Sequence, residues 1–127
     1  EAWSDGAQAY QGVTTTGFPN LFMLYGPNTN QGSLITMIEW EVDHALAHIR
    51  RLVTDNLAWI DVKADRQAAY NEQLQKDIES IEAWADGCNN YYSAPSGRVV
   101  TQWPKNMSAY RDMVLEIDPE AYEVASR

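Results

Sequence analysis

The stretch GFPNLFMLYGPNTNQGS, residues 17–33, combines an apolar run, a loop of turn-forming residues and the beginning of a helical pattern. The run NLFMLY, residues 20–25, has the length of a strand, and its lack of alternation is typical of a strand buried on both faces of a parallel sheet. The following GPNTNQG, residues 26–32, breaks the apolar pattern with Pro, Asn and Gly. The stretch therefore predicts a corner at which a buried strand passes through a loop into a helix.

Helical periodicity begins after Ser33, a suitable N-cap, and continues to about residue 56. Apolar residues three or four positions apart predict the inner stripe of an amphipathic helix: Ile35, Ile38, Val42, Ala45, Leu46, Ile49, Leu52 and Val53. The short run AWIDV, residues 58–62, is a second strand candidate. A strand, a helix and a strand in this order predict a right-handed parallel βαβ unit.

The second half of the chain predicts a helix, a β-hairpin and a short last helix. The helix extends from residue 64 to about residue 86, with an inner stripe of Tyr70, Leu74, Ile78, Ile81 and Ala85. NYYS and VVTQW flank the loop APSGR and predict the hairpin. Residues 108–117 predict the last helix, with Tyr110, Met113, Val114 and Ile117 inward, and the tail after Pro119 is expected to fray. The predicted class is α/β, in the order buried strand, long helix, short strand, second helix, β-hairpin and short C-terminal helix.

Length and composition predict one domain, residues 1–127, and exclude several classes of partner. The chain opens on EAWSDG without an initiator Met, which we interpret as the interior of a longer polypeptide. A formal charge of −9 argues against nucleic-acid binding, and no apolar run approaches the roughly 18 residues of a membrane span. The single cysteine, Cys88, cannot form an internal disulfide, which fits a reducing compartment and a cytoplasmic protein.

The loop after the predicted strand is the candidate ligand site, and it comprises Gly26, Pro27, Asn28, Thr29 and Asn30. A loop that leads into a helix presents free backbone N–H groups, and the helix dipole favours negative charge or electron-rich oxygen there. The loop is neither a Walker A motif, because Ser33 stands where that motif has Lys, nor a Gly-x-Gly-x-x-Gly fingerprint. The pattern alone favours a plain strand-to-helix turn over a ligand contact.

Several motifs, spread in order over residues 12–110, resemble pieces of one enzyme family. They are GFPNLFMLYGPNTN with an IE-bearing helix after it, RQAAYNEQLQKDI, and WADGCNNYYSAPSGRVVTQWP. On these motifs the chain resembles the C-terminal region of class B flavoprotein monooxygenases. These are the flavin-containing and Baeyer–Villiger enzymes, and the 4-hydroxyacetophenone monooxygenase-like branch is the most similar. The chain departs from the family pattern after GPNTN and at NNYY, which leaves its substrate specificity open.

The resemblance implies that the chain is the C-terminal segment of a larger FAD- and NADPH-dependent monooxygenase. Such a protein has a Rossmann-like, two-dinucleotide-binding architecture, in which residues 20–25 would be the last parallel strand and residues 26–30 would approach the isoalloxazine edge. The full enzyme would form a C4a-peroxyflavin with O₂ and oxygenate a small organic substrate, either a ketone or an N or S nucleophile. The motifs for the FAD pyrophosphate and for NADPH would lie upstream. The segment alone should therefore bind no cofactor, remain inactive and self-associate as a dimer or larger species through uncovered apolar surface.

The remaining candidates favour structural roles, and the sequence assigns no catalytic residue and no metal ligand. His44 and His48 lack the Glu of a zincin motif, so we interpret them as a partly exposed helix flank. Cys88 is interpreted as a buried packing residue. Five aromatic residues are interpreted as core: Trp59, Trp84, Trp103, Tyr91 and Tyr92. The alternative function is a stand-alone α/β module that binds a small ligand or a protein without catalysis.

Overall fold

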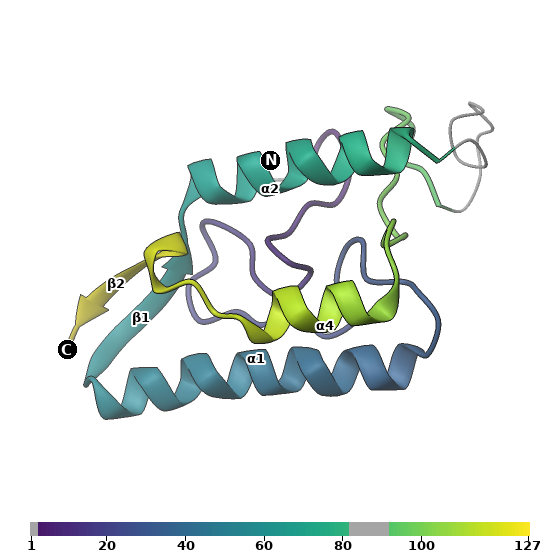
Figure 1. Cartoon of the computed structure of the whole chain (residues 1–127). Coiled ribbons are helices and arrows are strands. Elements are labelled where there is room, and N and C mark those ends of the chain that lie inside the picture. Colours follow the sequence, from purple (N-terminus) through teal and green to yellow (C-terminus); the bar gives the residue numbers. More distant parts are fainter. Residues whose placement is uncertain (1–2, 82–91) are drawn as a thin grey trace.

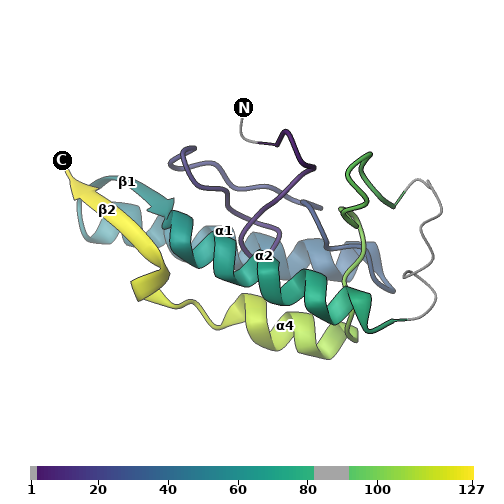
Figure 2. The same ribbon diagram turned by 90° about the horizontal axis from the view of Figure 1, so that it is seen from above.

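A computed structural model describes residues 3–81 and 92–127 of the chain. Its elements are α1 (Leu34–Thr54), β1 (Leu57–Val62), α2 (Ala64–Glu79), α4 (Met107–Leu115), the short 3₁₀ helix η1 (Pro119–Ala121) and β2 (Tyr122–Ser126). Figure 1 shows α1 and α2 as two long helices, with α4 beside α1 and the N-terminal loops in the frame between them. Figure 2 shows that most of these loops and α4 lie on opposite sides of the α1 and α2 layer.

The described strands form a two-stranded antiparallel sheet at one end of the helices (Figures 1 and 2). β1 pairs with β2, so that Ile60 lies opposite Val124 and Asp61 opposite Glu123. The prediction of a frayed tail is therefore wrong, because residues 122–126 complete this sheet. The prediction of a parallel βαβ unit is also wrong for the described residues, since β1 pairs with the C-terminal strand instead of residues 20–25.

The apolar run at residues 20–25 does not form the predicted buried strand. Asn20 and Tyr25 have φ angles of 62° and 55°, which interrupt extended backbone at both ends of the run. Leu21 and Leu24 are 44% and 50% exposed. A buried strand of this composition needs neighbouring strands in the same sheet, and the described residues supply none beside this run. The α/β class holds, whereas the Rossmann-like architecture stays an expectation about a longer polypeptide.

The first helix is confirmed close to its predicted bounds, but its buried face is not the predicted one. Its buried residues are Met37, Glu41, His44, Ala45 and His48. Five members of the predicted inner stripe are exposed instead and form what we call the α1 apolar stripe: Ile35, Val42, Leu46, Ile49 and Val53. Periodicity identifies the most apolar face of a helix, and here that face has no covering element among the described residues.

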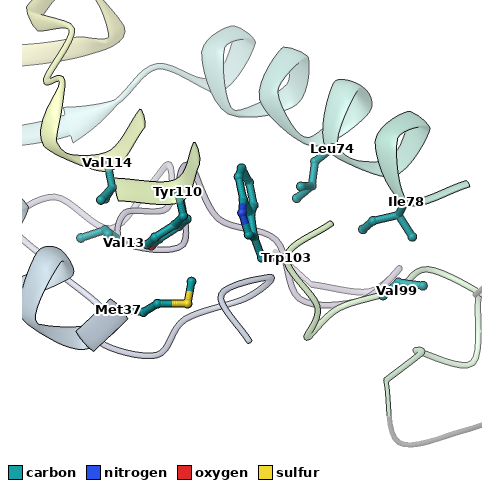
Figure 3. Close-up of a cluster of buried hydrophobic side chains, with 8 residues drawn as sticks. All are labelled: Val13, Met37, Leu74, Ile78, Val99, Trp103, Tyr110 and Val114. Carbon is teal, nitrogen blue, oxygen red and sulfur yellow. The ribbon is translucent and has the colours of Figure 1, made fainter. Parts of the chain in front are cut away.

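The main hydrophobic cluster fills the space between α1, α2 and α4 (Figure 3). It comprises Val13, Met37, Leu74, Ile78, Val99, Trp103, Tyr110 and Val114. Figure 3 shows Trp103 between Tyr110 of α4 and Leu74 of α2, and the rings of Trp103 and Tyr110 have centroids 5.3 Å apart. The inward positions predicted for Leu74, Ile78, Tyr110 and Val114 are therefore confirmed. A second cluster, which includes Ile60 and Tyr122, lies under the sheet.

The predicted hairpin is present as a short one. The N–H of Ala94 donates to the carbonyl of Arg98 at 2.8 Å, and Ser93 pairs with Val99. Of the predicted core aromatics, Trp103 is buried, Trp59 is half-buried and Tyr92 is 40% exposed. Four other residues with predicted roles lie outside the described residues: Cys88, the core aromatics Trp84 and Tyr91, and Ala85 of the inner stripe of the second helix.

None of the described helices combines the length and the apolarity that a membrane crossing requires.

Candidate functional site

The loop of residues 26–30 is held in place by the segment of residues 99–103. Asn28 is 1% exposed, and its side-chain Nδ2 donates to the carbonyls of Val99 and Gln102 at 2.9 and 3.0 Å. Two backbone N–H groups of the loop donate to carbonyls of the same segment at 2.9 and 3.0 Å. Residues about 70 positions apart in the chain thereby fix the conformation of the loop.

A close contact between Gly26 and Gly12 brings the loop against the turn of residues 10–14, which we call the N-terminal turn. A Cβ on Gly26 would collide with the backbone carbonyl of Gly12, and a Cβ on Gly12 would collide with the methyl group of Thr29. The Thr29 hydroxyl donates to the carbonyl of Gly26 at 2.7 Å, which closes the loop on itself. Only glycine leaves room for this approach, so the site depends on two residues without a side chain.

A surface hollow of about 380 Å³ opens beside the loop. Tyr25, Gly26 and Pro27 line one part of it, and Trp3, Val100 and Thr101 line another. Of the five predicted site residues, Gly26 and Pro27 therefore face the hollow. Asn28 and Thr29 are both 1% exposed and support the loop from behind, and half-buried Asn30 pairs with Gln102.

Two buried polar atoms, one behind the loop and one in the wall of the hollow, have no hydrogen-bond partner among the described residues. They are Oδ1 of Asn28, which follows Pro27, and Oγ1 of Thr101, which lines the hollow. A buried polar atom without a partner costs about 1–3 kcal/mol, so a native structure seldom keeps one without a reason. An acceptor and a hydroxyl beside an apolar wall suit a flat ligand that carries hydrogen-bonding groups along one edge.

Glu41 of α1 lies beneath the loop and is fully buried. Its Oε2 accepts from the N–H of Tyr25 at 2.6 Å, and its Oε1 lies 3.1 Å from the hydroxyl oxygen of Tyr110. Burial raises the pKa of the Glu41 carboxyl, although its hydrogen bonds oppose that shift. Glu41 was not predicted, because the buried face of this helix was assigned from its apolar positions alone. A second stripe with the spacing of a buried helix face, Met37, Glu41, His44 and His48, was the signal that could have found it.

The two histidines of α1 are each 1% exposed, so their interpretation as a partly exposed flank is wrong. His44 Nδ1 lies 2.6 Å from the carbonyl of Val114 and therefore carries a proton. His44 Nε2 lies 3.2 Å from the hydroxyl of Tyr122 and 3.1 Å from Nε2 of His48. Within residues 3–81 and 92–127 no group of three His, Cys, Asp or Glu side chains is arranged to hold a metal ion.

We expect acid to destabilise the chain through this histidine pair. Burial and the neighbouring His44 lower the pKa of His48 from 6.5 to about 4, and burial also lowers the pKa of His44. The unfolded chain then binds more protons than the folded chain between about pH 6.5 and pH 4. The free energy of unfolding should therefore fall across that window, by about 2 kcal/mol for His48 after allowance for solvent screening. Urea titrations at a series of pH values measure the slope, which His48→Gln should reduce; an equal slope in the variant would contradict the assignment.

No protein-family model matches the chain, but individual proteins do. The chain is 38% identical to a Baeyer–Villiger monooxygenase of Pseudomonas aeruginosa over 129 residues, which cover 99% of this chain and 24% of that protein. It is 32% identical to an FAD-binding monooxygenase of Aspergillus niger, over 92% of this chain and 20% of that protein. The chain thus spans about a quarter or less of the length of these relatives, and the match extends beyond residues 12–110.

A solved structure resembles the fold of the whole chain. The structure of oxidized steroid monooxygenase bound to NADP superposes with a TM-score of 0.85 at 23% sequence identity, over 100% of this chain and 25% of that one. At this level of identity the likeness concerns the fold alone. The arrangement of loops, helices and small sheet described above is therefore that of one segment within a larger protein of this architecture.

Proposed function

Because the chain belongs to the Baeyer–Villiger and flavin monooxygenase family, as a segment of a longer member, we propose that its loop of residues 26–30 faces a flavin. We call the longer polypeptide the parent. In this proposal the parent is an FAD- and NADPH-dependent monooxygenase that oxygenates a ketone or an N or S nucleophile, and residues 1–127 are its single C-terminal domain. The observation that carries the proposal is a loop held in one conformation beside a hollow, with the unpaired Oγ1 of Thr101 in the wall of that hollow.

The lining of the hollow fits the edge of a flavin ring. An isoalloxazine ring is flat and apolar over its faces, with carbonyl and N–H groups along one edge. The apolar side of the hollow, which includes Trp3 and Met23, matches the faces, while the Thr101 hydroxyl matches the polar edge. When bound, the flavin supplies the oxygen-activating chemistry. The residues of this chain would hold its position and exclude water from one side of it.

The loop also leads directly into α1, whose 21 residues align their peptide dipoles. The N-terminal end of such a helix favours negative charge. The backbone N–H groups of Asn28 and Asn30 donate to carbonyls of the 99–103 segment, so they hold the loop in place and are not themselves available to a ligand. The backbone of this region is therefore oriented before a ligand arrives. Orientation in advance is what allows a site to stabilise charge on a cofactor without rearrangement.

The α1 apolar stripe supports a second part of the proposal, that the rest of the parent packs on this helix. Five large aliphatic side chains stand exposed along five turns of one helix, and a hollow lined by Ile35, Ile38 and Val42 lies over the same face. Monomeric proteins rarely expose contiguous apolar surface of this extent. Three quarters of a relative's length lies outside the matched segment and is available to cover it.

Purification of the parent beside the 127-residue segment tests the proposal. We expect the parent to be yellow and to oxidise NADPH with uptake of O₂ when it is given a ketone or a sulfide, and the segment to be colourless and without turnover. A parent without flavin would contradict the proposal, and a yellow segment would contradict the assignment of FAD binding to upstream residues. An encoding frame without two upstream Gly-x-Gly-x-x-Gly units would favour a non-catalytic binding module instead.

A further inference from the structure

The contacts of the Tyr110 hydroxyl bear on the protonation state of Glu41. The Tyr110 hydroxyl has one proton and lies 2.9 Å from the carbonyl oxygen of Gln11 and 3.1 Å from Oε1 of Glu41. A carbonyl oxygen can only accept, so the contact with Gln11 is a hydrogen bond only if the Tyr110 proton points towards it. The contact with Glu41 is then a hydrogen bond only if the carboxyl group carries a proton and donates it to the Tyr110 oxygen.

The other groups that face Glu41 lead to the same result. The Thr29 hydroxyl, which also contacts the carboxyl, already donates its proton to the carbonyl of Gly26 at 2.7 Å. The N–H of Tyr25 remains as the one donor, at 2.6 Å from Oε2. An ionised carboxylate would thus have a single donor for two fully buried oxygens, whereas buried carboxylates are normally paired or bonded several times.

No positive charge compensates Glu41 within the described part of the chain. The ion pairs of that part all involve other carboxylates. His44, one turn further along α1, is the buried titratable residue that follows Glu41 on this helix, and its Nδ1 donates to the Val114 carbonyl. Burial lowers the pKa of His44, so this ring is neutral at physiological pH. Tyr110, from α4, is a neutral phenol whose pKa burial raises.

We propose that Glu41 is a positioning residue that acts as a neutral carboxylic acid. It joins α1 and α4 to the backbone at Tyr25, immediately before the loop of residues 26–30, and it places no charge behind that loop. This inference rests on the proposed function, in which the loop faces a flavin. Ionisation of Glu41 would put a negative charge behind backbone that is oriented to favour negative charge, and it would thereby weaken the site.

The dissociation constant of FAD from the full-length parent, measured by flavin fluorescence from neutral to alkaline pH, tests the proposal. Glu41→Gln keeps the size of the side chain, one acceptor for Tyr25 and one donor for Tyr110, so it should bind FAD within about twofold of wild type at neutral pH. Wild type should lose affinity as the pH rises, and Glu41→Gln should not. Glu41→Ala leaves the Tyr25 N–H without its acceptor and removes one of the two contacts of the Tyr110 hydroxyl, so it should weaken FAD binding about tenfold at every pH.

Glu39→Gln is the matched control, because Glu39 is exposed on the same helix, and it should behave as wild type. Infrared spectra provide a readout that does not depend on flavin: wild type should show a protonated, buried carboxyl band that Glu41→Gln lacks. Absence of that band, or a Glu41→Gln variant that binds FAD as weakly as Glu41→Ala, would contradict the proposal that Glu41 is protonated. Unchanged FAD affinity in Glu41→Ala would overturn the positioning role. A parent that holds no FAD yet shows the band would contradict the proposed function and retain the protonated Glu41.

Discussion

Replacing Gly26 with alanine should weaken FAD binding by the parent at least tenfold, corresponding to about 1.4 kcal/mol or more. The new Cβ would meet the backbone carbonyl of Gly12, and a backbone group cannot rotate away as a side chain can. The φ angle of Gly26 lies outside the left-handed region, so alanine suits the local backbone and the collision alone accounts for the effect. The loop or the N-terminal turn must therefore move, and the unpaired Asn28 Oδ1 moves with the loop.

Gly17→Ala is the matched control for this experiment. A Cβ at Gly17 meets no atom within 4 Å, but its φ of +83° disfavours alanine. This variant should cost about 1 kcal/mol of stability without a change in FAD affinity. Equilibrium dialysis or fluorescence measures the affinity, and urea titration measures the stability. A Gly26→Ala parent that binds FAD as wild type does would show that the loop is not the wall of the flavin site.

Charged residues on the α1 apolar stripe should have opposite consequences in the segment and in the parent. Leu46 and Ile49 are 39% and 43% exposed in the segment, so Leu46→Asp with Ile49→Asp should change its free energy of unfolding by less than about 1 kcal/mol. The same change should convert self-associated segment to monomer, which sedimentation measures. In the parent, the two carboxylates would be buried without partners at a cost of several kcal/mol, and we expect little soluble flavoprotein.

Arg50→Gln, an exposed position beside the stripe, is the control and should leave both proteins unaffected. Normal yield of yellow parent from the double variant would show that water, and not protein, covers the stripe. A segment that sediments as a monomer before any substitution would contradict the expected self-association.

The helices of this protein could be predicted from the sequence because their apolar periods are long and regular. Residues 34–54 form a helix near the predicted bounds, and the helix predicted for residues 64 to about 86 begins as expected but ends at residue 79. Tyr110 and Val114 lie inward as expected. The buried face of α1 could not be predicted, since apolar periodicity contains no information about which part of a larger protein is present. The strand β2 was missed for a related reason: its partner lies about 60 residues earlier, and pairing at that distance leaves no local pattern.

The position of the candidate loop could be predicted from the sequence, but the residues that hold the loop in place could not. Turn-forming residues located the loop, and its five residues remain a predicted flavin contact. The hydrogen bonds from Asn28 to the carbonyls of Val99 and Gln102 could not be predicted, because they join distant segments of the chain. Glu41 was overlooked because a charged residue in a helix is normally solvated. Its burial depends on Tyr25 and Tyr110, whose positions only the folded chain reveals.

Helix α1 buries a largely polar face and exposes its apolar stripe, and this affects the order in which parts of the parent become rigid. Its inward residues form directional hydrogen bonds, which select one arrangement but contribute little net free energy, whereas its outward residues are those whose burial drives folding. Hydrogen bonds inside the segment therefore determine its conformation, while contact with the rest of the parent supplies most of its stability. We expect it to be the last region of the parent to gain protection from hydrogen exchange during folding, and the first to lose it when the neighbouring domain separates.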